Sequence, residues 1–91
     1  KKIENIIIAI LKAESSLNPC ATNKNKNGSI DYGICQFNDK WWIGKNKPLK
    51  TPADALDVNQ SINLMCKIIQ KQKNGLKNWV AYNNNSYKKF L

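Results

Sequence analysis

Apolar residues at the start of the chain recur at intervals of three and four. Five of them lie between positions 3 and 11: Ile3, Ile6, Ile7, Ile10 and Leu11. This spacing is typical of one face of an amphipathic helix, so we predict a helix from residue 3 to about residue 15. The Asn18-Pro19 pair predicts an end soon after, because proline disfavours helical backbone in the residue before it.

One acidic residue interrupts this apolar face. Glu14 follows Ile10 by four positions and Leu11 by three, so it lies on the same side of the predicted helix. Charged side chains normally avoid such a face, because burial disfavours their ionised form. A glutamate at the end of a helix that has turned to solvent explains the pattern about equally well.

The pattern changes to a period of two after residue 20. Asn27-Gly28 is a typical hairpin turn. After it, Ile30, Tyr32 and Ile34 alternate with other residues, as they would in a short strand. We expect a small antiparallel hairpin in an otherwise helical chain.

Helical spacing returns in the second half, after a connection rich in lysine, proline and glycine over residues 43–52. Thr51-Pro52 predicts a helix start, and Asp57 predicts a second one as the N-cap of a capping-box variant with Gln60. The stripe expected on the following helix is Val58, Ile62, Met65 and Ile69. Asn74-Gly75 predicts its end, residues 76–82 form a short apolar segment, and the aromatic residues of the tail can dock back.

The length of 91 residues predicts a single domain over residues 1–91 with a modest core. No apolar run reaches the length of a membrane span, so we expect no transmembrane segment. The chain begins at Lys1 without an initiator Met and with no visible leader. We therefore expect either a processed form or a module of a larger protein. We also expect the domain to be monomeric.

The net charge of +9 comes from fifteen lysines and no arginine. Such a charge favours polyanionic partners, of which bacterial cell walls and nucleic acids are both examples. The lysines are scattered with no long basic block, so charge alone does not choose between these partners.

Cysteine usage argues against a dense disulfide framework. Cys20, Cys35 and Cys66 allow one internal disulfide at most. The chain has no histidine, and no cysteine pair has the spacing of a zinc site. We expect neither a metal nor another cofactor.

The segment from Glu14 to Trp42 combines two carboxyl groups in different settings. An apolar neighbourhood would keep Glu14 protonated as a general acid, and the short polar groups Asn23, Asn25, Ser29 and Asn38 would keep Asp31 ionised. Cleavage of a glycosidic bond needs such a pair. Taken alone, Asp31 is more simply a solvated strand residue.

Tryptophans follow this pair and would suit sugar rings. Trp41, Trp42 and Trp79 have flat faces that stack on pyranoses, although core packing is the commoner fate of tryptophan in a small domain. Adjacent tryptophans do not easily both point inward, so at least one of Trp41 and Trp42 should be partly exposed.

The string ESSLNPCATNKNKNGSIDYGICQFNDKWW (residues 14–42) resembles the catalytic stretch of the C-type lysozymes. GLKNWVAY (75–82) resembles a later segment of that family, and DVNQSINLMCKII (57–69) its central helix. The resemblance implies a lysozyme-like α+β fold, mainly helical, with a small antiparallel β-hairpin beside the active-site cleft.

The same resemblance implies roles for individual residues. Glu14 would be the general acid and Asp31 the nucleophile or cation stabiliser. The implied substrate-binding residues are Asn25, Gln36, Asn38, Trp41, Trp42, Asn78 and Trp79. The implied supporting residues are Asn23, Ser29 and Tyr82.

Departures from the family pattern leave the far end of the groove open. The family's disulfides and first helix are missing, the stretch after Trp42 is shortened, and Lys71 lies near where an acidic sugar contact is common. The chain also resembles the small lytic transglycosylases of bacteria and phages in Glu14-Ser15, in NGS-DYGI-Q-N and in Ala81-Tyr82-Asn83.

These resemblances predict a peptidoglycan-cleaving muramidase that acts on the β-1,4 bond between N-acetylmuramic acid and N-acetylglucosamine. The first alternative is a lytic transglycosylase, which would use Glu14 as both acid and base. The second is a non-catalytic module that binds wall glycans or nucleic acid. We expect peptidoglycan strands and the anionic wall as partners, without specific nucleic acid. The expected setting is the bacterial wall, reached by secretion, on a virion or through phage lysis.

Overall fold

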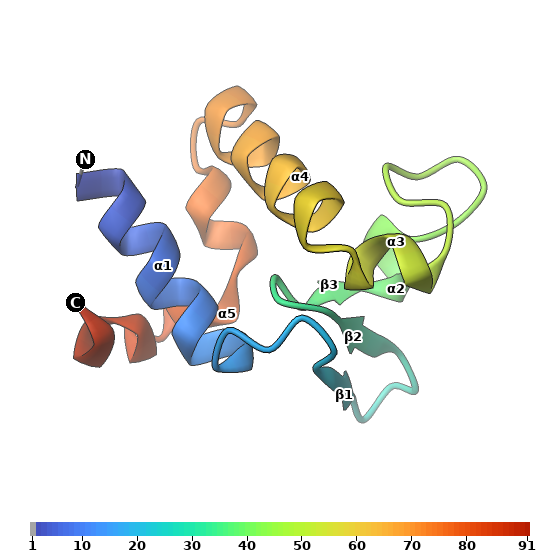
Figure 1. The fold of residues 1–91 in the computed structure, drawn as a ribbon, viewed down its shortest axis with the longest axis horizontal. Helices are drawn as coiled ribbons and strands as arrows, with labels where there is room; N and C mark the ends of the chain where they lie inside the picture. Colours follow the sequence, from blue (N-terminus) through green and yellow to red (C-terminus); the bar gives the residue numbers. More distant parts are fainter. Residues whose placement is uncertain (1) are drawn as a thin grey trace.

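The computed structural model describes residues 2–91 as a mainly helical fold with a small antiparallel sheet at one side (Figure 1). The α-helices are α1 (Lys2–Ser15), α2 (Asp39–Trp42), α3 (Pro52–Leu56), α4 (Val58–Lys71) and α5 (Val80–Asn83). The 3-10 helices are η1 (Gly75–Asn78) and η2 (Ser86–Phe90), and the strands are β1 (Thr22–Lys24), β2 (Ile30–Tyr32) and β3 (Phe37–Asn38). The predicted α+β fold class is confirmed.

Helix α1 begins and ends close to the predicted positions, and its apolar stripe is buried towards the C-terminal end, whereas Ile3 at the start is 40% exposed. Ala9 and Ile10 are completely buried and Leu11 is nearly so. The helix packs against α5 and against η2 at the end of the chain (Figure 1). After Ser15 the backbone leaves the helix through two residues with positive φ, Ser16 and Leu17. This reversal carries the chain into the sheet.

The sheet has the strand order β1-β2-β3, so the predicted hairpin is extended by a third strand. Asp31 lies in the central strand, opposite Asn23 on β1 and Asn38 on β3. Strand β2 ends at Tyr32, earlier than the predicted alternation through Ile34. The chain turns there instead and reverses direction before β3 begins.

The helix starts of the second half agree with the prediction, with two corrections. Thr51 and Asp57 are the N-caps of α3 and α4, and Asp57 accepts from the Gln60 N–H at 3.0 Å. The Gln60 side chain does not close the capping box, because it donates to Asp54 instead. Val58 belongs to the predicted stripe but is 38% exposed, so the buried face of α4 does not include it. The residues buried on this helix are Ser61, Met65 and Ile68.

The end of α4 and the following segment differ in detail from the prediction. The helix ends at Lys71, before Asn74-Gly75, and buried Gly75 begins η1. The apolar segment is divided by extended backbone at Trp79, which separates η1 from α5. In the tail, Tyr87 is buried against the fold, whereas Leu91 is 68% exposed.

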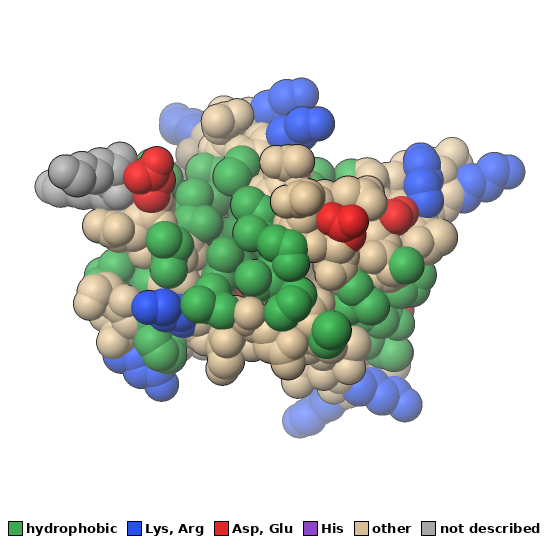
Figure 2. All heavy atoms as spheres, in the orientation of Figure 1, with side chains coloured by type: hydrophobic (Ala, Val, Ile, Leu, Met, Phe, Trp, Pro, Cys, Tyr) green, Lys and Arg blue, Asp and Glu red, His purple; other side chains and the backbone are tan. Residues whose placement is uncertain are grey.

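The core lies among these elements and includes one of the three cysteines. Its residues are Ala9, Ile10, Leu11, Ile34, Cys35, Phe37, Ile43, Leu49, Ala55, Met65, Ile68, Trp79, Ala81 and Tyr87. Figure 2 shows further apolar side chains between α1 and α4. All three cysteines are free thiols, and burial raises the pKa of Cys35 to about 12. Cys35 therefore stays protonated at neutral pH and packs as an apolar group.

Two glycines with similar backbone angles allow a matched test of the packing between sheet and helix. Gly33 has φ +84° and Gly28 has φ +89°. A Cβ on Gly33 would lie 2.1 Å from the Ala55 carbonyl oxygen, whereas a Cβ on Gly28 would meet open space. Left-handed backbone costs an ordinary residue about 1–2 kcal/mol, and forced overpacking adds roughly 1–3 kcal/mol.

We therefore expect Gly28→Ala to lower the free energy of unfolding by about 1–2 kcal/mol and Gly33→Ala by about 3 kcal/mol or more. Urea titrations of both variants and the parent measure this. Equal losses in the two variants would contradict the close approach of Gly33 to Ala55.

Candidate functional site

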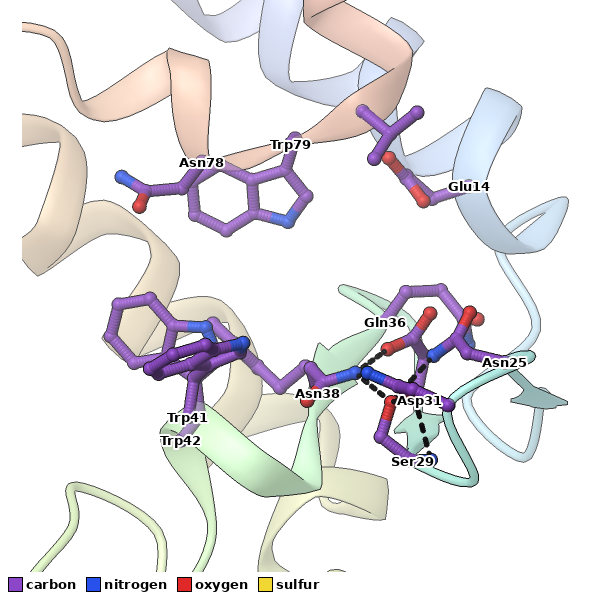
Figure 3. A pocket seen from close by; sticks show the side chains of 13 residues that line it. Glu14, Asn25, Ser29, Asp31, Gln36, Asn38, Trp41, Trp42, Asn78 and Trp79 are labelled. Carbon is purple, nitrogen blue, oxygen red and sulfur yellow. Dashed lines mark hydrogen bonds between the residues drawn. The ribbon is translucent and has the colours of Figure 1, made fainter.

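Most of the predicted site residues line a single cleft of about 290 Å³. The predicted residues among them are Glu14, Asn25, Ser29, Asp31, Gln36, Asn38, Trp41, Trp42, Asn78 and Trp79. Figure 3 shows Glu14, Asn78 and Trp79 on one side and the sheet residues with Trp41 and Trp42 on the other. The fold thus brings together side chains from α1, the sheet, α2 and the η1–α5 junction.

Glu14 lies near the end of α1, where the helix packs against α5. Its side chain is partly buried, and its Oε2 accepts a hydrogen bond of 2.9 Å from the backbone N–H of Ala81. Desolvation raises the pKa of this carboxyl, the Ala81 N–H lowers it, and the charge of Asp31 raises it. The net direction is upward, which favours a carboxyl that still holds a proton to donate.

Asp31 has a polar environment built from the next strand. Asn38 donates from Nδ2 to Asp31 Oδ1 at 2.8 Å and also lies 2.9 Å from Ser29 Oγ. The Oδ1 of Asn38 accepts from the Lys40 N–H at 3.0 Å, because Asn38 is the N-cap of α2. This cap orients the Asn38 amide so that its donor end faces Asp31 (Figure 3).

A second group of polar side chains holds Ser29 in place behind Asp31. Ser29 Oγ donates to Asn27 Oδ1 at 2.6 Å, and Asn25 Nδ2 donates to Ser29 Oγ at 3.1 Å. Asn27 Oδ1 also accepts from the Ser29 N–H at 2.9 Å. The residues of the hairpin turn therefore form a connected network that reaches Asp31 through Asn38, whereas the direct hydrogen bonds expected from Asn25 and Ser29 to Asp31 are not formed.

The three tryptophans differ in exposure. Trp41 is 67% exposed, which confirms that at least one of the adjacent pair faces solvent, and Lys40 Nζ lies 5.4 Å from its ring centroid. Trp42 and the buried Trp79 both pack edge-on against Phe37, with centroids 5.6 and 5.9 Å from it. Trp79 is therefore both a core residue and part of the cleft wall.

The amides of Gln36 and Asn78 are already hydrogen-bonded within the protein. Gln36 Nε2 donates to the Gly33 carbonyl at 2.8 Å and lies 3.2 Å from the Ala21 carbonyl. Asn78 Nδ2 lies 2.8 Å from the Gly75 carbonyl and 2.9 Å from Gln72 Oε1. These bonds orient both side chains at the edge of the cleft before any ligand is bound.

Two predicted supporting residues lie outside the cleft lining. Asn23 is opposite Asp31 in the sheet, but its Nδ2 donates to Gln36 Oε1 at 2.7 Å rather than to Asp31. Tyr82 stacks on Tyr87 with ring centroids 5.2 Å apart. The Tyr82 side chain lines a separate hollow with Ile69 and Leu76.

The cleft also has lining residues that the sequence interpretation did not name as site residues: Asn27, Phe37 and Val80. Asn27 has a local signal, since it begins the Asn-Gly turn. Phe37 and Val80 have none, because they reach the cleft only through tertiary packing. The same is true of the Ala81 N–H, whose contact with Glu14 spans 67 positions of sequence.

Within residues 2–91, no cluster of three or more His, Cys, Asp or Glu side chains is arranged to hold a metal ion. None of the helices over the same residues has the length and apolar character needed to cross a membrane.

Comparison with protein families gives a match over nearly the whole chain. The model of the C-type lysozyme/alpha-lactalbumin family matches residues 2–90. Lysozyme C of Dromaius novaehollandiae is 36% identical over 86 residues, which covers 85% of this chain and 58% of that protein. The chain therefore spans less than two thirds of the length of this relative.

Solved structures of lysozymes share the fold. A lysozyme from Litopenaeus vannamei superposes with a TM-score of 0.71 at 32% identity and covers 90% of this chain and 70% of its own. Canine milk lysozyme gives 0.71 at 31% identity, and the lysozyme of Equus asinus 0.69 at 30%, each covering 88% of this chain and 68% of its own.

The raised pKa of Glu14 predicts a pH-dependent effect on stability. Folded chains keep this proton over a pH range in which unfolded chains have lost it, so the parent loses stability as pH rises through that range. Glu14→Gln lacks this loss. We expect the free energy of unfolding of Glu14→Gln, relative to the parent, to increase as the pH rises above the ordinary glutamate pKa of about 4.3.

Urea titrations at several pH values measure this difference. Glu4→Gln is the matched control, because Glu4 is an exposed residue in the first turn of the same helix, where a carboxylate favours the helix dipole. Its relative stability should stay level or fall over the same range. A level difference for Glu14→Gln would contradict the desolvated setting of this carboxyl.

Proposed function

The chain belongs to the C-type lysozyme/alpha-lactalbumin family, and from that premise we propose that it is a muramidase. Its substrate would be peptidoglycan, cut at the β-1,4 bond between N-acetylmuramic acid and N-acetylglucosamine. The family includes both muramidases and non-catalytic alpha-lactalbumins. Family membership alone therefore does not decide whether the chain is an enzyme, and the residues of the cleft have to decide it.

The observation that carries the proposal is the contrast between two carboxyl groups lining one cleft. Glu14 is desolvated and its pKa is raised, whereas Asp31 accepts a hydrogen bond from an amide N–H. In retaining glycosidases such a contrast distinguishes the general acid from the nucleophile or cation stabiliser, and lysozyme is itself the type case. A module that only binds glycans has no need of a desolvated glutamate.

Glu14 would act first, as the general acid. Its protonated carboxyl would donate to the glycosidic oxygen as the bond to the anomeric carbon breaks. The Ala81 N–H holds one oxygen of the carboxyl in place. The other carboxyl oxygen would then face the substrate. The hydrogen bond from Ala81 would therefore orient the Glu14 carboxyl group for proton donation.

Asp31 would stabilise the positive charge that then develops on the sugar. The Asn38 amide and the Ser29 network hold this carboxylate on the opposite side of the cleft from Glu14 (Figure 3). In a retaining mechanism Asp31 forms a covalent bond or an ion pair with the anomeric carbon until water attacks, with Glu14 as base. This mechanism requires the two carboxyl groups to lie about 5–5.5 Å apart, and the charge of Asp31 is one of the causes that raise the pKa of Glu14.

The tryptophans and amides would bind the glycan strand. The exposed face of Trp41 and the neighbouring Trp42 offer stacking surfaces for pyranose rings. Asn25, Gln36, Asn38 and Asn78 would contribute polar contacts from the cleft edges. Three residues would support the site without contacting the sugar. Asn23 would do so through the sheet, Ser29 through the Asp31 network and Tyr82 through the packing of α5.

The proposed place of action is the bacterial cell wall. C-type lysozymes are typically secreted animal proteins, and the relatives compared above come from a bird, a shrimp and mammals. The matches lend no support to a phage or virion route, nor to the lytic transglycosylase reaction. We therefore favour a secreted hydrolase. We also infer that it acts as a monomeric domain without a cofactor and without a specific nucleic-acid partner.

Product analysis tests this proposal directly. We expect digestion of purified peptidoglycan to give reducing-end N-acetylmuramic acid, detected by mass spectrometry. Asp31→Asn should lower the rate about 100-fold or more, because a pre-organised charge that stabilises the transition state is lost. Asp57→Asn is the matched control, since asparagine caps a helix as well as aspartate does.

Two results would overturn the assignment. Products with 1,6-anhydro-muramoyl ends, lighter by one water, would identify a transglycosylase. Full activity of Asp31→Asn, at the level of the Asp57→Asn control, would remove Asp31 from the reaction.

The positive charge is proposed to attract the chain to the anionic wall rather than to take part in cleavage. The net charge is +9, and on the face seen in Figure 2 the lysines are scattered rather than gathered in one block. A distributed charge of this kind supports long-range attraction to a polyanion. At 0.1 M salt, attraction between exposed charges more than about 10 Å apart is largely screened.

We therefore expect lysis of whole cells to fall steeply as salt rises, while cleavage of a short neutral chito-oligosaccharide changes much less. Turbidity measures the first rate and chromatography of the products the second, in the same salt series. Equal salt sensitivity on both substrates would count against this role. Tight, salt-dependent binding of DNA with no lytic activity would favour the nucleic-acid alternative.

A further inference from the structure

The turn between β2 and β3 is held by side chains from three different parts of the chain. The Gly33 carbonyl accepts from Gln36 Nε2, the Ile34 carbonyl from Ser15 Oγ and the Cys35 carbonyl from Trp79 Nε1, each at 2.8 Å. Gly33, Ile34 and Cys35 are all buried. Buried carbonyl groups need partners, and here side chains supply them on three consecutive residues.

Two of these bonds come from residues beside the Glu14 site. Ser15 directly follows Glu14 at the end of α1, and Trp79 precedes by two positions the residue whose N–H donates to Glu14 Oε2. The contacts close a ring, from Glu14 and Ser15 to the turn, then through Trp79 to Ala81 and back to Glu14. The ring joins α1, the turn and the η1–α5 junction.

Asp31 is connected to the same ring through the backbone. It lies on β2, three residues before Ile34. The turn directly follows β2, so the position of the turn restrains the strand that carries Asp31 to the cleft. The Ser15 hydroxyl is the direct link between the helix that carries Glu14 and the segment that carries Asp31. Figure 3 shows these two carboxyl groups on opposite sides of the opening.

The geometry of Ser15 distinguishes this link from an ordinary helix contact. A serine near a helix end commonly donates to the carbonyl four residues earlier, and Leu11 O does lie 3.1 Å from Ser15 Oγ. The Ile34 carbonyl is closer, at 2.8 Å, and comes from 19 positions away. A hydroxyl has one proton to donate, and the shorter contact is the one that crosses between segments.

We propose that Ser15 is a positioning residue, whose hydrogen bond to Ile34 sets the placement of Glu14 relative to Asp31 across the cleft. This inference rests on the proposed function for its catalytic consequence, although the placement itself is measurable without catalysis. Loss of the hydroxyl would loosen the ring. Water would then reach Glu14 more easily, and Asp31 would be held less firmly beside it.

The chain offers a matched control in Ser61. Its side chain is also fully buried, and its hydroxyl makes no hydrogen bond to any of the three turn carbonyls. It lies on α4, near the Cys35 sulfur rather than at the carbonyls of the turn. Ser61→Ala therefore removes a buried hydroxyl from the same core without breaking the ring, and comparison with Ser15→Ala separates positioning from general core packing.

The experiment compares the parent, Ser15→Ala and Ser61→Ala under conditions in which urea titration shows all three to be folded. The first readout is the titration midpoint of the Glu14 carboxyl, followed by carbon-13 NMR. We expect a lower midpoint in Ser15→Ala alone, because desolvation and the nearby Asp31 charge, which both raise it, are weakened together. The second readout is cleavage of a chito-oligosaccharide, where kcat should fall about tenfold in Ser15→Ala with little change in KM.

The two readouts fail in different ways. An unchanged Glu14 midpoint in Ser15→Ala, or the same change in both variants, would overturn the positioning role. A parent chain that cleaves no glycan would contradict the proposed muramidase function, while the NMR comparison would still decide the role of Ser15.

Discussion

The constraint on which the site depends is a carboxyl group on the apolar face of α1. Burying Glu14 among packed helices costs free energy unless the carboxyl finds a partner. Its described partner is a backbone N–H of α5, which comes from near the other end of the chain. Helix α1 and the η1–α5 junction must therefore pack in one relative position, and that packing brings Trp79 to the wall of the cleft. The same desolvation that costs stability raises the pKa of Glu14, which favours the protonated form that a general acid needs.

The opposite side of the cleft places a second carboxyl group in a polar environment. Short polar side chains from a tight turn supply hydrogen bonds within a small space, and the N-cap of α2 fixes the amide of Asn38 that donates to Asp31. The sheet is small, yet its three strands are enough to hold Asp31 between Asn23 and Asn38.

Local patterns predicted much of this arrangement, because the elements involved have strong local signals. The spacing of isoleucines predicted α1 with Glu14 on its buried face, Asn27-Gly28 predicted the hairpin, and Thr51-Pro52 and Asp57 predicted two helix starts. The resemblance to a known family added the grouping of Gln36, Asn78 and Trp79 with the carboxyl pair. No spacing argument brings residues so far apart in sequence to the same cleft.

The features that were not predicted depend on tertiary contacts. The short strand β3 has no periodicity of its own, and β2 ends early because Gly33 lies against the Ala55 carbonyl. Val58 follows the helical spacing but faces solvent, since the neighbouring stripe of α4 meets the core. Asn23 and Tyr82 find partners other than the expected ones. The Ser15 bond crosses 19 positions and has no local signature in sequence.

The central claim is that Glu14 supplies the proton that breaks the glycosidic bond. The most direct measurement compares the parent with Glu14→Gln for both binding and cleavage of the same chito-oligosaccharide. The amide is nearly isosteric with the carboxyl and can still accept from the Ala81 N–H, but it has no acidic proton. The account predicts an unchanged dissociation constant and a cleavage rate lower by at least about 10²-fold. Cleavage at close to the parental rate, with binding intact, would contradict it.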